Sequence, residues 1–265
     1  DLEQSDLLSS IYGRNGDAPM PVIAISKPSD AFDMAIEACR IAVQYMTPVI
    51  LLSDNFIANG AEPWPLPDLD AMEPFEVEFT TEKGDDFLSF GRNENLARPW
   101  VKPGTPGMEF RIGGLEKAPT SNISYDPDNH QAMTDLRHAK VRKVADSIPT
   151  PEVEGPESGE LLVVGWGSTV GILKQACDRV RAGGKDVSRL HLTHVWPLPH
   201  GLDEIFSKFD RILVPEMNVE QMTVLLRGEL PEHTYVPYNK VTGQPFLVAE
   251  VAERIEATLA EAKKA

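Results

Sequence analysis

From residue 159 to the end of the chain, apolar segments of strand length alternate with longer segments whose apolar residues recur at helical spacing. This alternation predicts an α/β fold with a mostly parallel sheet covered by helices, because parallel strands need a crossover between them. The expected elements are strands at 161–164, 190–195 and 212–214, and helices at 169–182, 202–209, 219–228 and 246–264.

Three of these helices carry further signals. Asn218 and Gln221 form a capping-box pattern at the start of the helix 219–228. Gly183 follows the helix 169–182 and is expected to end it. The last helix is predicted to face the core through Val248, Val251, Ile255 and Leu259.

A strand–helix–strand unit is predicted in residues 19–54. Apolar strands are expected at 21–25 and 49–52, and Ser29 is the predicted N-cap of the helix between them. One side of this helix is apolar and is interpreted as core, not as a cofactor site; it comprises Phe32, Ile36, Cys39 and Val43.

Between these two regular regions, prolines interrupt nearly every candidate element of residues 62–159. We expect long irregular segments here, and such segments are usually functional or packed on a partner. One helix is predicted at 129–145, and residues 149–159 are interpreted as an interdomain linker.

The composition narrows the class of protein. The net charge of −16 disfavours nucleic acid as a partner, because phosphate backbones are repelled by a field of this sign. No apolar run approaches the ~18 residues of a membrane span, so a soluble protein is expected.

Cys39 and Cys177 are interpreted as buried small hydrophobes in a reducing cytoplasm, and two cysteines are too few for an iron–sulfur cluster. Because the chain begins without Met or a leader pattern, we interpret it as a fragment.

Several motifs have simple structural interpretations. The turn 165–169 lacks the glycines and lysine of a phosphate-binding loop, so a tight turn is preferred. His191 and His194 are three residues apart on a strand and point to opposite faces, which excludes a shared metal. Asp126 opens a segment similar to a calcium loop, but the later Gly and Glu positions of such a loop are missing.

The turn 12–17 places Arg14 between two glycines, just before an apolar strand. A guanidinium matches a carboxylate in planar, bidentate fashion, so a carboxylate-bearing substrate would be a natural ligand. The structural alternative is a C-capping turn in which Arg14 pairs with Asp17.

Four segments in the first part of the chain stand out together: Gln4-Ser5-Asp6-Leu7-Leu8, Tyr12-Gly13-Arg14-Asn15-Gly16-Asp17-Ala18-Pro19, Thr47-Pro48-Val49-Ile50-Leu51-Leu52-Ser53-Asp54 and Asn59-Gly60-Ala61-Glu62-Pro63-Trp64. With these segments the chain closely resembles the alpha subunit of 2-oxoglutarate:ferredoxin oxidoreductases. The resemblance continues through Asp128-Asn129-His130 and Leu136-Arg137 into the regular α/β region.

The resemblance implies a fold and a set of cofactors. Residues 1–155 would be the later part of a pyrimidine-binding thiamine-diphosphate domain, and 156–265 a transketolase C-terminal-like domain. Thiamine diphosphate would lie at an interface with a beta subunit that holds Mg²⁺ and the iron–sulfur cluster. The assembly would be a heterodimer or a dimer of heterodimers. The glutamate that activates the cofactor would lie upstream of Asp1.

The implied reaction is oxidative decarboxylation of 2-oxoglutarate with coenzyme A to succinyl-CoA and CO2, with electrons passing to ferredoxin. By the family pattern Arg14 faces the substrate carboxylate, with Asn15, Tyr12 and Asp6 as its neighbours in substrate binding. No catalytic or metal-binding residue is expected in this chain. Alternatives are a pyruvate or other 2-oxoacid enzyme, another thiamine enzyme such as a dehydrogenase beta chain, and a non-catalytic scaffold subunit.

Overall fold

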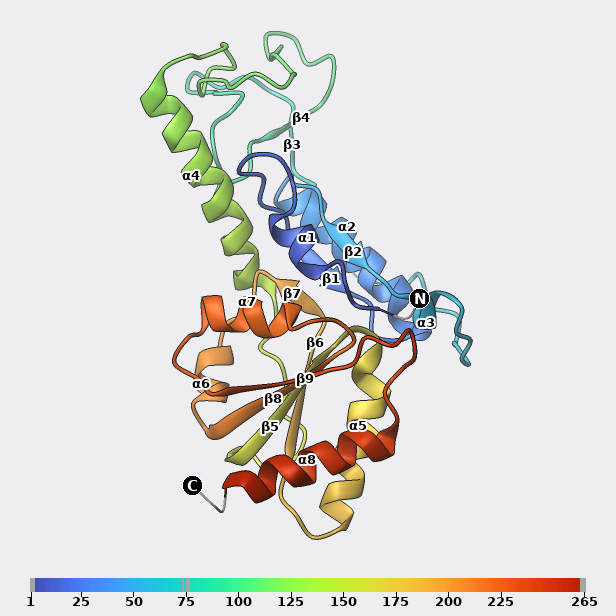
Figure 1. Cartoon of the computed structure of the whole chain (residues 1–265). Helices are drawn as coiled ribbons and strands as arrows, with labels where there is room; N and C mark the ends of the chain where they lie inside the picture. The colour runs from blue at the N-terminus through green and yellow to red at the C-terminus, as the bar shows by residue number, and fades with distance from the viewer. Residues whose placement is uncertain (1–2, 73, 75–76, 263–265) are drawn as a thin grey trace.

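The computed structural model describes residues 3–72, 74 and 77–262. It contains two main sheets, one above the other in Figure 1: the larger is parallel, and the smaller has one parallel and one antiparallel strand pair. The α/β class is therefore confirmed. Along these described residues no helix is long and apolar enough to cross a membrane.

The larger sheet has the order β6-β5-β8-β9 and is entirely parallel. Its strands are β5 (Gly159–Trp166), β6 (Ser188–Leu192), β8 (Phe209–Glu216) and β9 (Tyr235–Asn239). Strand β9 was not expected from the sequence because Pro237 interrupts it. A proline is tolerated there because β9 is an edge strand.

Helices cover both faces of this sheet. Helices α5 (Val170–Ala182) and α8 (Val248–Ala262) pack on one face, and α6 (Leu202–Phe206) and α7 (Gln221–Glu229) lie on the other. Side chains of β5 alternate between the two cores, with Leu161 and Val163 against α5 and Leu162 and Val164 on the opposite side. The strand–helix alternation read from residues 159–265 is thus confirmed.

The predicted strand 190–195 is divided in two. Strand β6 ends at Leu192, and after Thr193 the chain continues as β7 (His194–Trp196) in the smaller sheet. There β7 pairs antiparallel with β1 (Val22–Ala24), which pairs parallel with β2 (Ile50–Leu52). The order β2-β1-β7 shows that the two sheets are linked by continuous backbone.

The helix of the predicted strand–helix–strand unit, α2 (Ala31–Gln44), is present, but two expectations about it are wrong. Ser29 is not its N-cap, because Pro28 begins a turn of 3-10 helix and the carboxylate of Asp30 accepts the N–H groups of Ser26 and Lys27. Nor is the apolar stripe the core face. The buried side of α2 comprises Ile41 with Met34 and Ala38, whereas Cys39 is exposed and the rest of the stripe is half-buried.

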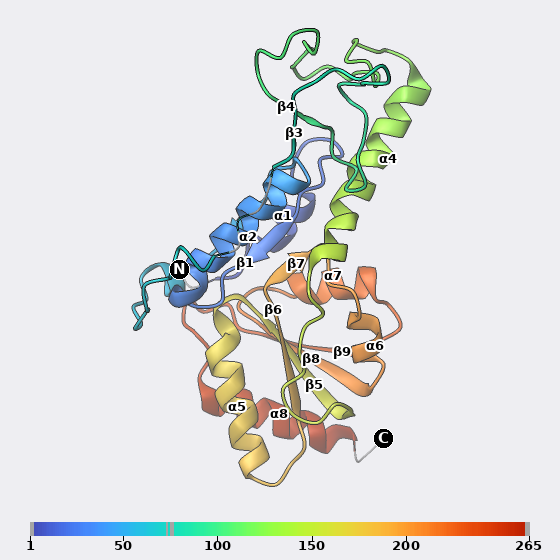
Figure 2. The same ribbon diagram turned by 180° about the vertical axis from the view of Figure 1, so that it is seen from behind.

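Residues 62–125 form an irregular insertion, and its only strands among the described residues are the short pair β3 (Phe79–Thr80) and β4 (Trp100–Val101). It lies beside the upper part of α4 (Pro127–Lys143), as Figures 1 and 2 both show. The expected helix 129–145 is confirmed with earlier bounds, because Asp126 accepts the N–H of Asn129 as its N-cap. The indole N–H of Trp100 donates to the carbonyl of Val43 at 3.0 Å and ties the insertion to α2.

The segment before α1 (Leu7–Tyr12) is fastened to the larger sheet by one buried side chain. The amide of Gln4 donates to the carbonyl of Trp166 at 2.7 Å and accepts the N–H of Met217 at 3.0 Å. Asn218 donates to the Gln4 carbonyl at 2.8 Å. Asn218 also caps α7 by accepting the N–H of Gln221, but the Gln221 side chain bonds Ser5 and Leu8 rather than completing the predicted capping box.

The contact between α2 and β7 should make stability depend on pH. His194 lies 3.1 Å from Glu37, and Arg40 donates to the same carboxylate. Burial would raise the pKa of Glu37, but the hydrogen bonds from Arg40 and His194 outweigh it and hold the pKa at about 2. A depressed carboxyl pKa stabilises the fold above its unfolded value near ~4.5.

We therefore expect the stability contributed by Glu37 to be lost as the pH falls from about 4.5 to about 2. Thermal unfolding followed by circular dichroism across this range should show a shallower pH dependence for Glu37→Gln than for the unsubstituted chain. Glu204→Gln, at an exposed position on α6, is the matched control and should retain the original slope. Equal slopes for all three proteins would contradict this role of Glu37.

Candidate functional site

The turn that follows α1, residues 13–18, is held by the side chain of Arg14. Gly13 ends the helix by donating its N–H to the carbonyl of Ser9 at 2.9 Å, and a Cβ there would lie 2.5 Å from that oxygen. The Arg14 guanidinium donates to the carbonyl of Ala18 at 2.6 and 3.1 Å and also to that of Ser10. It bonds backbone oxygens rather than Asp17, so the expected local ion pair is not formed.

Arg14 lies at the edge of a cavity of about 240 Å³. Four elements meet around this cavity: the end of α1, the lower part of α4, strand β7 and the end of α7. The side chains of Tyr12, Asp17, His138, Arg142, Trp196 and Glu229 line it together with Arg14. We call this space the Arg14 cavity.

A second guanidinium lies on the Arg14 cavity. Arg142 stacks over the ring of Trp196, with 5.1 Å from its Cζ to the ring centroid. It also donates to both carboxylate oxygens of Glu229, at 2.9 and 3.3 Å. A stacked and bidentate arginine is fixed in orientation, so Arg142 is a positioned cation beside Arg14 in the cavity.

The phenol of Tyr12 belongs to the same group of side chains. Partial burial raises the pKa of Tyr12, Glu229 raises it further, and Arg142 opposes both. The phenol therefore stays protonated at neutral pH and can donate a hydrogen bond to an anion in the cavity.

The structure brings together only part of the predicted set. Tyr12 and Arg14 share the cavity, whereas Asn15 is exposed in the turn and does not line it. Asp6 stands at the other end of α1 and lines a separate small cavity with Ser53 and Asp54. Sequence reasoning did not single out Arg142, Trp196 or Glu229, since no local pattern connects them with residues 12–17.

The carboxyl ends of β1, β2 and β5 meet at that second, smaller cavity of about 20 Å³. One of its carboxylates is already engaged, because Asp54 caps α3 (Asn55–Ala58) and accepts the hydroxyl of Ser168. This agrees with the interpretation of residues 165–169 as a tight turn, and Gly167 there has a φ of +58°.

His191 and His194 form hydrogen bonds with different partners, as their opposite directions on the strand predicted. The ring of His191 bonds the hydroxyl of Ser26 at 2.9 Å, and His194 bonds Glu37. Burial, aided by Arg189, lowers the pKa of His191 to about 3, so its imidazole is neutral. His191 joins β6 of the larger sheet to the end of β1, and His194 joins β7 to α2, so both roles are structural.

The described residues do not fit a metal ion or an iron–sulfur cluster. Across residues 3–72, 74 and 77–262 no group of three or more His, Cys, Asp or Glu side chains converges on one point. Cys39 is exposed on α2, contrary to expectation, whereas Cys177 is buried on α5, where burial raises its thiol pKa to about 12. The two thiols therefore stand on different helices.

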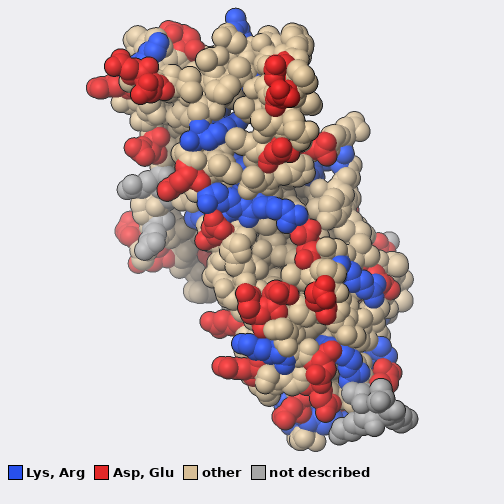
Figure 3. Space-filling view, turned by 90° about the vertical axis from the view of Figure 1, so that its left-hand side faces the viewer, with Lys and Arg blue, Asp and Glu red and all other residues tan. Residues whose placement is uncertain are grey.

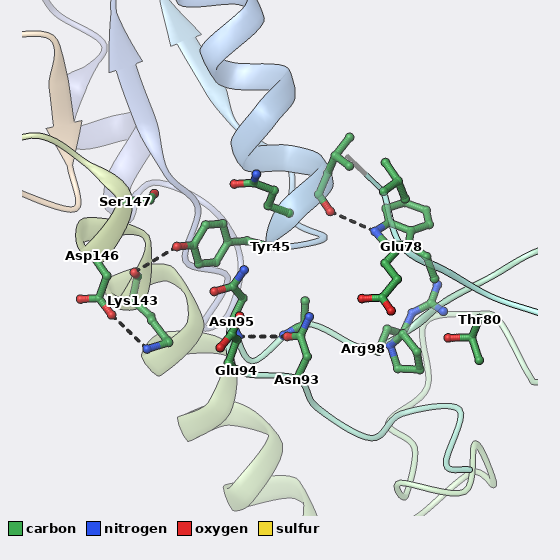
Figure 4. A pocket seen from close by; sticks show the side chains of 16 residues that line it. Tyr45, Glu78, Thr80, Asn93, Glu94, Asn95, Arg98, Lys143, Asp146 and Ser147 are labelled. Atoms are coloured by element: carbon green, nitrogen blue, oxygen red, sulfur yellow. Dashed lines mark hydrogen bonds and ion pairs between the residues drawn. The ribbon is translucent and has the colours of Figure 1, made fainter. Parts of the chain in front are cut away.

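A larger cavity of about 690 Å³ lies between the C-terminal end of α2 and the insertion. Figure 4 shows its lining side chains, among them Tyr45, Arg98 and Lys143. Tyr45 donates to the carbonyl of Lys143 at 3.4 Å, and Lys143 pairs with Asp146 at 3.0 Å.

Comparison with known proteins matches both halves of the chain. Residues 2–124 match the family described as pyruvate flavodoxin/ferredoxin oxidoreductase, thiamine-diphosphate-binding, and residues 159–251 match pyruvate:ferredoxin oxidoreductase core domain II. The chain is 45% identical to the 2-oxoglutarate oxidoreductase subunit KorA of Mycobacterium tuberculosis over 97% of its own length and 39% of that protein. It is 31% identical to the alpha subunit of 2-oxoacid:ferredoxin oxidoreductase 1 of Aeropyrum pernix, over 95% of this chain and 40% of that protein.

A solved structure extends these matches. The 2-oxoglutarate:ferredoxin oxidoreductase from Magnetococcus marinus, with 2-oxoglutarate, coenzyme A and succinyl-CoA bound, superposes with a TM-score of 0.88 at 29% identity. The match covers 97% of this chain and 45% of that one. The chain thus spans about two fifths of the length of the curated relatives.

The electrostatics of the Arg14 cavity can be tested through Tyr12. Glu229→Gln removes an acidic neighbour and should lower the pKa of Tyr12, whereas Arg142→Gln removes a cation and should raise it. The measurement is NMR titration of ¹³Cζ-labelled tyrosine, with Tyr12→Phe identifying the resonance. Shifts in the same direction for the two variants would contradict the geometry described.

Proposed function

Because the chain belongs to the 2-oxoacid:ferredoxin oxidoreductase family, in the region shared with its alpha subunits, we propose that it serves an enzyme that oxidatively decarboxylates 2-oxoglutarate. The products would be succinyl-CoA and CO2, with coenzyme A as co-substrate and ferredoxin as electron acceptor. The observation that carries this proposal is the 45% identity over 97% of the chain with a 2-oxoglutarate oxidoreductase subunit.

The proposal concerns a complete complex and not this chain alone. Residues 1–155 would supply part of the thiamine-diphosphate site, and 156–265 a transketolase C-terminal-like domain. A beta subunit would hold Mg²⁺ and the iron–sulfur cluster. We propose that the alpha and beta subunits form a heterodimer or a dimer of heterodimers in the cytoplasm.

In this enzyme, thiamine diphosphate supplies the nucleophile and the electron sink that decarboxylation of a 2-oxoacid requires. The residues of this chain would bind and orient the substrate. We propose that Arg14 binds the substrate carboxylate, exchanging its bonds to the backbone oxygens of Ala18 and Ser10 for a bidentate pair. Tyr12 would donate a hydrogen bond beside it. Asn15 and Asp6 remain predictions.

Two alternatives stay open because relatives carry different substrate names. The Aeropyrum pernix relative is named for 2-oxoacids in general and both matched families are named for pyruvate, so pyruvate or another 2-oxoacid is the second candidate. A scaffold subunit without catalytic function is the third candidate.

The test is anaerobic reduction of a one-electron acceptor by the complete, co-purified complex, dependent on coenzyme A. Faster reduction with 2-oxoglutarate than with pyruvate is the expected outcome. Preference for pyruvate would overturn the substrate but keep the family chemistry. No reduction with any 2-oxoacid, despite bound thiamine diphosphate and intact clusters, would favour the scaffold.

Substitution of Arg14 should weaken catalysis in that complex. For Arg14→Ala we expect kcat/KM for the 2-oxoacid to fall by about 30- to 1,000-fold, as for loss of a desolvated charge pair worth about 2–4 kcal/mol. Arg14→Lys keeps the charge but loses the planar fork, so it should restore only part of the rate.

The matched control is Arg179→Ala, which removes an exposed arginine of α5 and should leave kcat/KM unchanged. If Arg14→Ala behaves like this control, Arg14 does not contact the substrate.

A further inference from the structure

Three arginines, Arg92, Arg98 and Arg137, are near enough to Lys140 of α4 to lower its pKa, and we call these four cations the basic cluster. They are half-buried, and they occur in a chain whose net charge is −16. Figure 3 shows basic side chains in separate groups down the face that includes α4, with acidic side chains among them. Charges brought together in this way repel one another unless an anion lies among them.

Arg98 is positioned like a receptor for an anion. Its guanidinium lies over two aromatic rings, with 4.7 Å from Cζ to the centroid of Phe110 and 5.6 Å to that of Phe90. Within residues 3–72, 74 and 77–262 it makes no hydrogen bond or ion pair. Aromatic contacts fix the plane of a guanidinium but leave its N–H edge available for a bidentate acceptor.

Arg92 and Lys140 are poorly compensated as well. The buried Nε of Arg92 has no hydrogen-bond partner among the described residues, and its Nη2 reaches only the sulfur of Met133 at 3.8 Å. Lys140 donates to a single backbone oxygen, that of Met46, at 3.1 Å. Burial, and then the neighbouring arginines, lower the pKa of Lys140 to about 8. A buried donor without an acceptor is destabilising, and a bound anion would remove that cost.

The acidic groups nearby do not balance the cluster. Glu116 pairs with Arg137 at 3.1 Å and also contacts His130, so its charge is engaged at one edge. Glu78 and Glu94 line the 690 Å³ cavity that Arg98 also borders, but both are exposed. Burial alone lowers the pKa of Arg98, with no described carboxylate raising it. Three cations therefore remain without a described counterion.

We propose that Arg92, Arg98 and Lys140 bind a multiply charged anion, namely a phosphate or pyrophosphate group of a small molecule. Three cations call for more than one negative charge, and a tetrahedral phosphate offers oxygens to both guanidinium forks at once. The 690 Å³ cavity provides access for a small molecule at Arg98. The group could be free phosphate or the phosphates of coenzyme A, and the proposal does not rest on the reaction proposed above.

The test is isothermal titration of the complete complex with inorganic pyrophosphate, after saturation with thiamine diphosphate to fill the cofactor site. Arg98→Gln and Lys140→Met should each weaken pyrophosphate binding by at least about 10-fold, corresponding to about 1.4 kcal/mol. Arg111→Gln, at an exposed position of the same insertion and outside the cluster, is the matched control and should change it by less than about twofold.

Competition distinguishes the two sources of the phosphate. If coenzyme A displaces pyrophosphate from the unsubstituted complex but not from Arg98→Gln, the ligand is the coenzyme. If only inorganic phosphate and pyrophosphate compete, it is free phosphate. Binding that is absent, or unaffected by both cluster substitutions, overturns the proposal.

Stability without an anion provides an independent readout. Lys140→Met removes one of several mutually repelling charges, so in phosphate-free buffer it should raise Tm by about 2 °C. Added pyrophosphate should then stabilise the unsubstituted complex more than this variant. A lower Tm for Lys140→Met, with equal stabilisation by pyrophosphate, would show that Lys140 serves the fold and would contradict the proposal.

Discussion

The arrangement of the molecule depends on one short strand, β7, which leaves the larger sheet and pairs with β1 in the smaller one. The backbone hydrogen bonds of β7 fix the sheets relative to each other. They place Trp196 beneath Arg142 and bring His194 to Glu37. The Arg14 cavity exists because this strand, the end of α1 and the end of α4 meet. Gln4 has the same effect at the other end of α1, where buried polar groups must find partners within the protein.

Arginine has three different roles in this chain, decided by what surrounds each guanidinium. Arg142 is fixed by stacking and by a bidentate carboxylate. Arg14 is satisfied by backbone oxygens of its own turn, which a stronger acceptor can displace because a charged carboxylate binds more tightly than neutral carbonyls. Arg98 is stacked on aromatic rings and has no described acceptor. The first arrangement favours rigidity, whereas the other two leave donors for an anionic ligand.

Much of the fold could be predicted because periodicity reports burial within single elements. The alternation after residue 159, the helix α4 and the parallel pair β1 and β2 were all expected. The features that the sequence did not predict depend on contacts between elements that are far apart in the chain. The face of α2 that is buried depends on which side meets β1 and α4, and Cys39 is therefore exposed on a helix whose opposite side holds Ile41. Strand β9 has no clean pattern because edge strands tolerate proline. For the site, the local turn identified Tyr12 and Arg14, but Arg142, Trp196 and Glu229 come from distant segments.

We propose that this chain binds a 2-oxoacid for decarboxylation in a thiamine-dependent complex. The most direct measurement is release of labelled CO2 from [1-¹⁴C]2-oxoglutarate by the complete complex with coenzyme A and an electron acceptor. We expect one labelled CO2 for every two electrons delivered to the acceptor. Absence of labelled CO2 from a complex that holds thiamine diphosphate and intact clusters would contradict it.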